Sequence, residues 1–142
     1  LCIGMLYDRY HTRNLLYYGG LVQVMPIFSI FFLVFTLANL GLPGMVNFVG
    51  EFLVLIGTWK VNTTVIVLAS IGLILGAVYS IWFYNRLVFG QVRFYSLQKF
   101  SDLTRREFFV LLPLFVMVFV MGIYPALFLD AFNISVNNYI YL

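Results

Sequence analysis

The sequence predicts an all-α membrane protein with about three transmembrane helices, one of them interrupted, together with the end of a truncated fourth helix. Of its 142 residues, 63% are hydrophobic and only 9% are charged, whereas soluble domains are about 45–50% apolar and about 25% charged. The few charges are clustered, so that long uncharged tracts separate them. These observations exclude a water-soluble domain, a disordered chain and a nucleic-acid-binding module, which needs a basic face.

The last two predicted spans each contain a long uncharged tract. Residues 61–85 and 108–129 carry no charge, and both tracts exceed the roughly 20 residues that a helix needs to cross about 30 Å of hydrocarbon. We therefore predict helices over residues 65–89 and 105–128. A polar loop over residues 90–104 joins them, and a tail over residues 129–142 follows. Ser101, Thr104 and Glu107, spaced at three-residue intervals, predict a capping region for the last helix.

The first predicted span, residues 26–59, contains an interruption at Leu42-Pro43-Gly44. Pro43 lacks a backbone N–H and disfavours a helical conformation at the residue before it, and Gly41 and Gly44 flank this break. Two arrangements are compatible with a break at this point. The tract is either one crossing made of two half-helices or a hairpin of two crossings.

The distribution of basic residues favours the single crossing. One crossing places seven of the eight Lys and Arg residues on one side of the membrane and leaves only Lys60 on the other, whereas a hairpin divides them five against three. Because cytoplasmic loops carry an excess of Lys and Arg, the uneven division is the expected one. The loops over residues 8–20 and 90–104 then lie on the cytoplasm-like side, with Lys60 and the C-terminus opposite, and residues 1–7 end an earlier helix. The seven residues are Arg9, Arg13, Arg86, Arg93, Lys99, Arg105 and Arg106.

Glu51 is the candidate functional residue because it is the only charged residue between Asn14 and Trp59. A carboxylate inside a bilayer costs several kcal/mol unless it is protonated, paired or hydrated. Eight residues separate it from Trp59, which at about 1.5 Å per residue places it roughly 12 Å from the outer interface. We predict that Glu51 transfers protons. The alternative is a static ion pair with a Lys or Arg of another segment.

Further polar and conformationally special residues accompany Glu51. Asn47 lies four residues before it, on the same helical face, and the interruption frees backbone groups that must face protein or a water-filled cavity. The predicted supporting residues of the proton path are Thr36, Asn39, Pro43, Gly44 and Asn47. Cys2 and His11 each occur once in the chain, so that no metal site is predicted. We interpret Arg105, Arg106 and Glu107 as a topology signal and a surface ion pair.

Several segments resemble a known family. FTLANLGLPGMVNFVGEFLVLIGTW, ILGAVYSIWFYNRLVFG and LQKFSDLTRREFFVLLPLFVMVFVMGIYPALFLD resemble the C-terminal part of the subunit 4 family of NADH:ubiquinone oxidoreductase, respiratory complex I. YDRYHTR and YYGGLVQVMP extend the resemblance over essentially the whole chain. The wider family includes subunits 2 and 5 and the Mrp-type antiporter subunits. The Gly50-Glu51-Phe52 form favours subunit 4, since subunits 2 and 5 usually carry Lys at this position.

The resemblance implies a fold, a site and partners. The interrupted span would be the twelfth helix of a fourteen-helix antiporter-like bundle, and Glu51 would end a proton half-channel that opens to the intermembrane space. NADH, FMN, iron–sulfur clusters and ubiquinone are expected elsewhere in the complex, and no cofactor is expected in this chain. The expected partners are other membrane-arm subunits, including the polypeptide or segment that carries the upstream helices, and the lipid bilayer, with no nucleic acid.

The resemblance also implies a location, and it leaves two other functions open. The chain is expected in the mitochondrial inner membrane, with the loops over residues 8–20 and 90–104 in the matrix and with Lys60 and the C-terminus in the intermembrane space. The bacterial plasma membrane is the alternative location. The alternative functions are a structural membrane-arm subunit, in which Glu51 is a static ion-pair partner, and an Mrp-type cation/proton antiporter subunit.

Overall fold

The computed structural model describes residues 1–91 and 101–140, and over these ranges all regular structure is helical. This confirms the predicted all-α class for the described part of the chain. The predicted loop residues Arg93 and Lys99 lie outside it, as do residues 141–142. The elements in chain order are α1 (Cys2–Tyr10), the short 3-10 helix η1 (Leu15–Tyr17), α2 (Leu21–Val24), α3 (Pro26–Asn39), α4 (Val46–Val61), α5 (Thr63–Val88), α6 (Arg105–Ile123) and α7 (Ala126–Ile140).

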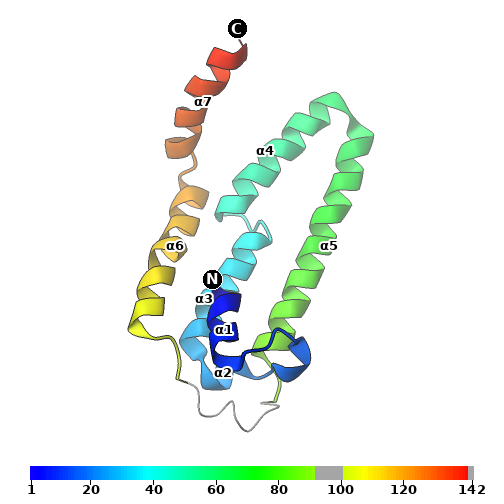
Figure 1. Ribbon diagram of the computed structural model, residues 1–142. Coiled ribbons are helices and arrows are strands. Elements are labelled where there is room, and N and C mark those ends of the chain that lie inside the picture. The colour runs from blue at the N-terminus through cyan, green and yellow to red at the C-terminus, as the bar shows by residue number, and fades with distance from the viewer. Residues whose placement is uncertain (92–100, 141–142) are drawn as a thin grey trace.

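The helices α3 and α4 run in the same general direction, one after the other, and α5 returns beside them (Figure 1). The interrupted tract therefore does not fold back as a hairpin, and its crossing of the membrane as a single span stays a prediction. Arg9, Arg86 and Arg105 belong to the ends of α1 and α5 and to the start of α6, which lie together at one end of the molecule. Lys60 belongs to the last turn of α4, at the opposite end.

Two helices of the described chain have the length and composition of membrane spans. They are α5, with 26 residues, and α6, with 19 residues, and only 6% of the most apolar window of each is buried by the rest of the chain. A core helix of a soluble protein would be mostly buried. The apolar surfaces of α5 and α6 are instead left free for lipid or for other helices, as expected of membrane-spanning segments.

The structure corrects the predicted end of the last span. The helix predicted over residues 105–128 ends at Ile123, and the predicted tail contains a further helix, α7. Pro125 explains the break, because it has no N–H to donate and excludes the preceding residue from the helical region. Tyr124 accordingly has φ −123° and ψ 64°. A proline is tolerated in the first turn of a helix, and Leu129 N donates to Pro125 O at 3.0 Å as α7 begins.

Aromatic and aliphatic side chains fill a core between α3, α5 and α6, near the end of the molecule that carries Arg9. Phe28 on α3 is fully buried, and Phe31 makes edge-to-face contacts with Phe108 and Phe115 of α6, with ring centroids 5.5 and 5.3 Å apart. Such aromatic pairs add to the free energy gained by burying their area. The first half of the interrupted span is thereby held between two apolar helices. The other fully buried side chains are Leu21, Met25, Val88 and Leu111.

Hydrogen bonds at the helix starts complete this end of the fold. Thr104 and Glu107 form a reciprocal capping box at the start of α6, as their spacing predicted. Asp102 accepts hydrogen bonds from Ile27 N and Phe28 N, at 2.8 and 3.2 Å, and thus caps the first turn of α3 from a distant part of the chain.

The ion pair of Glu107 differs from the predicted one. Its carboxylate pairs with Arg9 of α1 at 2.7 Å, in place of the neighbouring Arg105 or Arg106. The two side chains are only 11% and 16% exposed, so that this pair connects packed elements and does not lie on the open surface.

Candidate functional site

The interruption between α3 and α4 is a defined turn centred on Gly41. Gly41 N donates to Ala38 O at 3.2 Å, and Leu42 N donates to Leu37 O at 3.3 Å. These two bonds, with Gly41 at φ +68°, form the Schellman motif by which helices end on a left-handed residue. Pro43 then prevents the helix from resuming. Two of the carbonyl groups released at the end of α3, those of Leu37 and Ala38, are therefore satisfied within the turn.

The carboxyl group of Glu51 lies against this turn. Glu51 is on the second turn of α4, and its carboxylate covers the position at which Gly41 would carry a side chain. A Cβ added at Gly41 would collide with Oε2 and lie 2.9 Å from Cδ and 3.3 Å from Oε1 of Glu51. The predicted acid and the predicted interruption are thus in direct contact. Over the described residues, the Glu51 carboxylate has no hydrogen-bond or ion-pair partner.

A groove of about 480 Å³, lined in part by Glu51, lies between α4 and α5. Asn47 and Glu51 are its polar lining residues. Asn47 lies on the same helical face as Glu51, as predicted, although no hydrogen bond joins their side chains. Glu51 is partly exposed, and it both contacts the turn at Gly41 and lines this groove. The remaining lining residues are Val46, Gly50, Val54, Leu55, Ala69 and Leu73.

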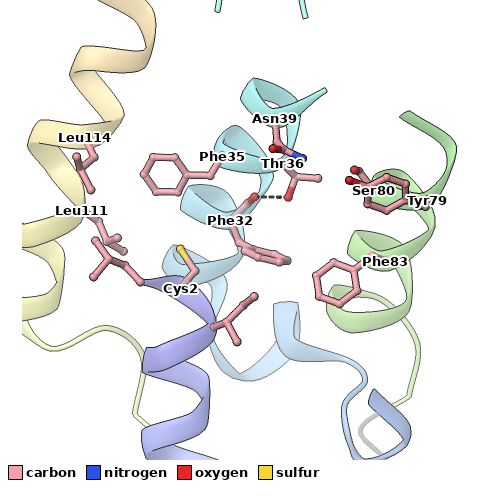
Figure 2. Close-up of a pocket in the computed structure, with 12 residues that line it drawn as sticks. Cys2, Phe32, Phe35, Thr36, Asn39, Tyr79, Ser80, Phe83, Leu111 and Leu114 are labelled. Atoms are coloured by element: carbon pink, nitrogen blue, oxygen red, sulfur yellow. Dashed lines mark hydrogen bonds between the residues drawn. The ribbon is translucent and has the colours of Figure 1, made fainter. Parts of the chain in front are cut away.

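Thr36 and Asn39 face a different cavity. It has a volume of about 450 Å³ and lies between α1, α3, α5 and α6 (Figure 2). Thr36 Oγ1 donates to Phe32 O at 2.6 Å, which leaves the hydroxyl oxygen as an acceptor toward the cavity. None of the residues that line this cavity lines the groove beside Glu51. The described residues thus bring Asn47 and the interruption to Glu51, whereas Thr36 and Asn39 line a separate space.

Gly122 is a site residue that the reasoning from sequence missed. It lies in the last turn of α6, and a Cβ there would collide with Gly44 O and lie 2.5 Å from Met45 Cα and 2.6 Å from the Gly44 carbonyl carbon. The backbone of the interruption therefore rests directly on α6. The available signal was a glycine among bulky apolar residues, one turn before Pro125, but the pattern does not name the surface that it contacts.

The described side chains do not form a metal centre. No group of three or more His, Cys, Asp and Glu side chains lies close enough together to hold an ion within residues 1–91 and 101–140. The site is thus a single carboxylic acid between a helix interruption and a mostly apolar groove. Such a group can exchange a proton or pair with a cation supplied from outside the described residues.

Comparisons with known proteins match nearly the whole chain. The transmembrane family NADH:quinone oxidoreductase/Mrp antiporter matches residues 1–78. NADH-ubiquinone oxidoreductase chain 4 of Marchantia polymorpha is 55% identical and that of Chondrus crispus 51% identical, each over 97% of this chain and 28% of the relative. NADH-quinone oxidoreductase subunit M of Rhodobacter capsulatus is 48% identical over 97% of this chain and 27% of its own length. The chain thus spans a little over a quarter of these relatives.

Proposed function

The chain belongs to the NADH:quinone oxidoreductase/Mrp antiporter transmembrane family, and from this premise we propose that it is part of the proton-translocating membrane arm of complex I. The names of the relatives support this choice within the family, because chain 4 and subunit M are both named as parts of an NADH oxidoreductase. In this proposal the redox reaction takes place elsewhere in the complex. NADH, FMN, iron–sulfur clusters and ubiquinone are held by other subunits, and this chain moves protons.

Glu51 is the residue that we propose carries the proton, at the exit end of a half-channel. The observation that supports this role is the position of its carboxylate, which rests on the interruption at Gly41 and borders the groove beside α5. A carboxylate in this position can accept a proton that arrives from the protein interior and release it toward the end of the molecule that carries Lys60. Because burying an acidic side chain in a membrane has a free-energy cost, an acid at this position supports a functional role such as proton transfer.

The proposed partners are the other membrane-arm subunits and the segment or polypeptide that carries the upstream helices. The exposed apolar surfaces of α5 and α6 fit contact with lipid and with such helices. We propose the mitochondrial inner membrane as the location, with the bacterial plasma membrane as the alternative. The end of the molecule at Arg9 and Arg86 faces the matrix, or the cytoplasm in a bacterium, by the positive-inside rule.

The test is the substitution Glu51→Gln in the full-length subunit within the assembled complex. Glutamine has nearly the same shape but cannot ionise, so we expect a lower ratio of protons pumped to electrons transferred, with assembly retained. Asp130→Asn is the matched control, because it removes the same charge from an exposed position on α7. An unchanged proton-to-electron ratio and turnover in the assembled Glu51→Gln complex would overturn the proposal.

The same experiment separates the two alternatives. If Glu51 is a static ion-pair partner, Glu51→Gln reduces the amount of assembled complex while leaving the proton-to-electron ratio of the remainder unchanged. If the chain serves an Mrp-type antiporter, the transport that Glu51→Gln impairs depends on sodium. Ion transport is therefore measured with and without sodium in the same vesicles.

A further inference from the structure

Gly41 and Glu51 are in contact across the helix interruption, although they belong to different segments. Oε2 of Glu51 lies where the side chain of any other residue at position 41 would begin, and the rest of the carboxyl group is within 3.3 Å of that point. We propose that Gly41 is a positioning residue, whose missing side chain forms the seat that holds the Glu51 carboxylate at the end of α3. Its effect on pumping rests on the proposed function, whereas the seat itself does not.

The seat determines which of two environments the carboxylate occupies. With glycine at position 41, the carboxylate lies against the turn that ends α3. With a larger residue at position 41, the side chain of Glu51 must rotate away from the turn, and the space open to the Glu51 carboxylate is the groove between α4 and α5. There, Val54, Ala69 and Leu73 present apolar surface, and Asn47 is the available hydrogen-bonding side chain. The position of the carboxylate is thus set by residue 41, ten residues before it in the chain.

Gly41 also has a left-handed backbone conformation, so that any substitution there strains the turn. A test must separate this strain from the loss of the seat. Gly90, at the end of α5, supplies the matched control, because it too has a positive φ of +99° and a Cβ added to it meets none of the described residues within 4 Å. Gly90→Ala therefore strains the backbone at a helix end without touching Glu51.

The first measurement is labelling of Glu51 by a hydrophobic carbodiimide in the assembled complex, followed by mass spectrometry of the peptide that contains it. The carboxylic acid O–H adds across the carbodiimide to give an acylurea, so labelling reports access to the acid and does not require pumping. We expect Gly41→Ala to raise the labelling rate severalfold, because the carboxyl group moves into the open groove, and Gly90→Ala to leave it unchanged. Equal labelling rates of Glu51 in Gly41→Ala and Gly90→Ala would overturn the proposal that Gly41 forms the seat.

The second measurement is rescue by a shorter acid. Glu51→Asp withdraws the carboxylate by one methylene group, away from the position that a Cβ at residue 41 occupies. We therefore expect Gly41→Ala to have no further effect on labelling or on the proton-to-electron ratio in the Glu51→Asp background. If Gly41→Ala changes the labelling rate and the proton-to-electron ratio equally with Glu51 and with Glu51→Asp, its effect is due to backbone strain, and the proposal is overturned.

The two proposals fail separately. If Gly41→Ala changes labelling but Glu51→Gln leaves the proton-to-electron ratio unchanged, the seat stands and the proton-transfer role of Glu51 falls. If Glu51→Gln lowers the ratio but labelling is the same with either residue at position 41, the proton-transfer role stands and the seat falls.

Discussion

Arg9 and Glu107 form a two-pronged ion pair across 98 positions of the chain. Arg9 Nη1 donates to Oε1 of Glu107 at 3.0 Å, and Nη2 donates to Oε2 at 2.7 Å. Both side chains are largely buried, and Glu107 also accepts a hydrogen bond from Thr104 N at 2.8 Å. Paired arginine and carboxylate groups of this geometry are among the stronger polar contacts in proteins. The pair connects α1 to the start of α6 at the end of the molecule opposite Lys60.

We expect the removal of either partner to destabilise the packing of α1 against α6. Arg9→Ala leaves a largely buried carboxylate without its cation, and the loss of a hydrogen bond to a charged group costs about 1.5–3 kcal/mol. The measurement is the midpoint temperature of thermal inactivation of the assembled complex for Arg9→Ala, Glu107→Ala and the double variant. Arg105→Ala is the control, since it removes the same charge from an exposed position in the same turn as Glu107. Strictly additive effects of the two single substitutions would contradict a direct pair.

Asp102 is predicted to stabilise the first turn of α3. Its two carboxylate oxygens accept from Ile27 N and Phe28 N, which are among the N–H groups that the start of a helix leaves without partners, Pro26 having none to donate. Asp102→Ala should destabilise this helix start by about 1 kcal/mol, the usual cost of losing an N-cap. Hydrogen–deuterium exchange of the peptide that contains Ile27 should become faster, whereas Asp8→Ala, at an exposed acid of α1, should not change it. Unaltered exchange in Asp102→Ala would show that the cap is dispensable.

The sequence predicted those features of the fold that depend on short segments of the chain, namely the length of a span and the break at a proline. The uncharged tract before Arg86 predicted α5 to within a few residues of Thr63–Val88, because length and apolarity are sufficient to identify a span. Pro43 predicted the interruption because it lacks an N–H and stands between Gly41 and Gly44, whereas Pro113, which has no such glycines beside it, lies within α6 without ending that helix. Pro125 also lacks an N–H. The prediction of the last span extended past Pro125 because the apolar tract continues beyond it.

The contacts between distant parts of the chain, including those at the site, were not predictable in this way. The pairing of Asp102 with Ile27 joins residues 75 positions apart, and the contact of Gly122 with Gly44 depends on how α6 crosses the interruption. Neither relation leaves a periodic pattern in one sequence. The position of Glu51 beside Gly41 likewise depends on the angle at which α4 leaves the turn. Charge and apolarity identified the acid and the break, whereas their contact required the three-dimensional arrangement.

Replacement of Gly122, the glycine of α6, by any larger residue is predicted to be destabilising. A Cβ there would meet the backbone of Gly44 and Met45, which cannot rotate away as a flexible side chain can. Inserting a methyl group into such a contact costs about 1–3 kcal/mol, so that Gly122→Ala should lower the inactivation temperature of the assembled complex. Because the displaced segment ends α3 and begins α4, labelling of Glu51 by the carbodiimide should change as well.

Gly72→Ala is the matched control for this prediction, because a Cβ at Gly72 meets none of the described residues within 4 Å. Replacing a glycine by alanine within a helix stabilises it by up to about 1 kcal/mol when space is free. The two variants thus add the same methyl group and are expected to shift the inactivation temperature in opposite directions. If Gly122→Ala instead raises that temperature as Gly72→Ala does, and leaves Glu51 labelling unchanged, then α6 does not support the interruption through this contact.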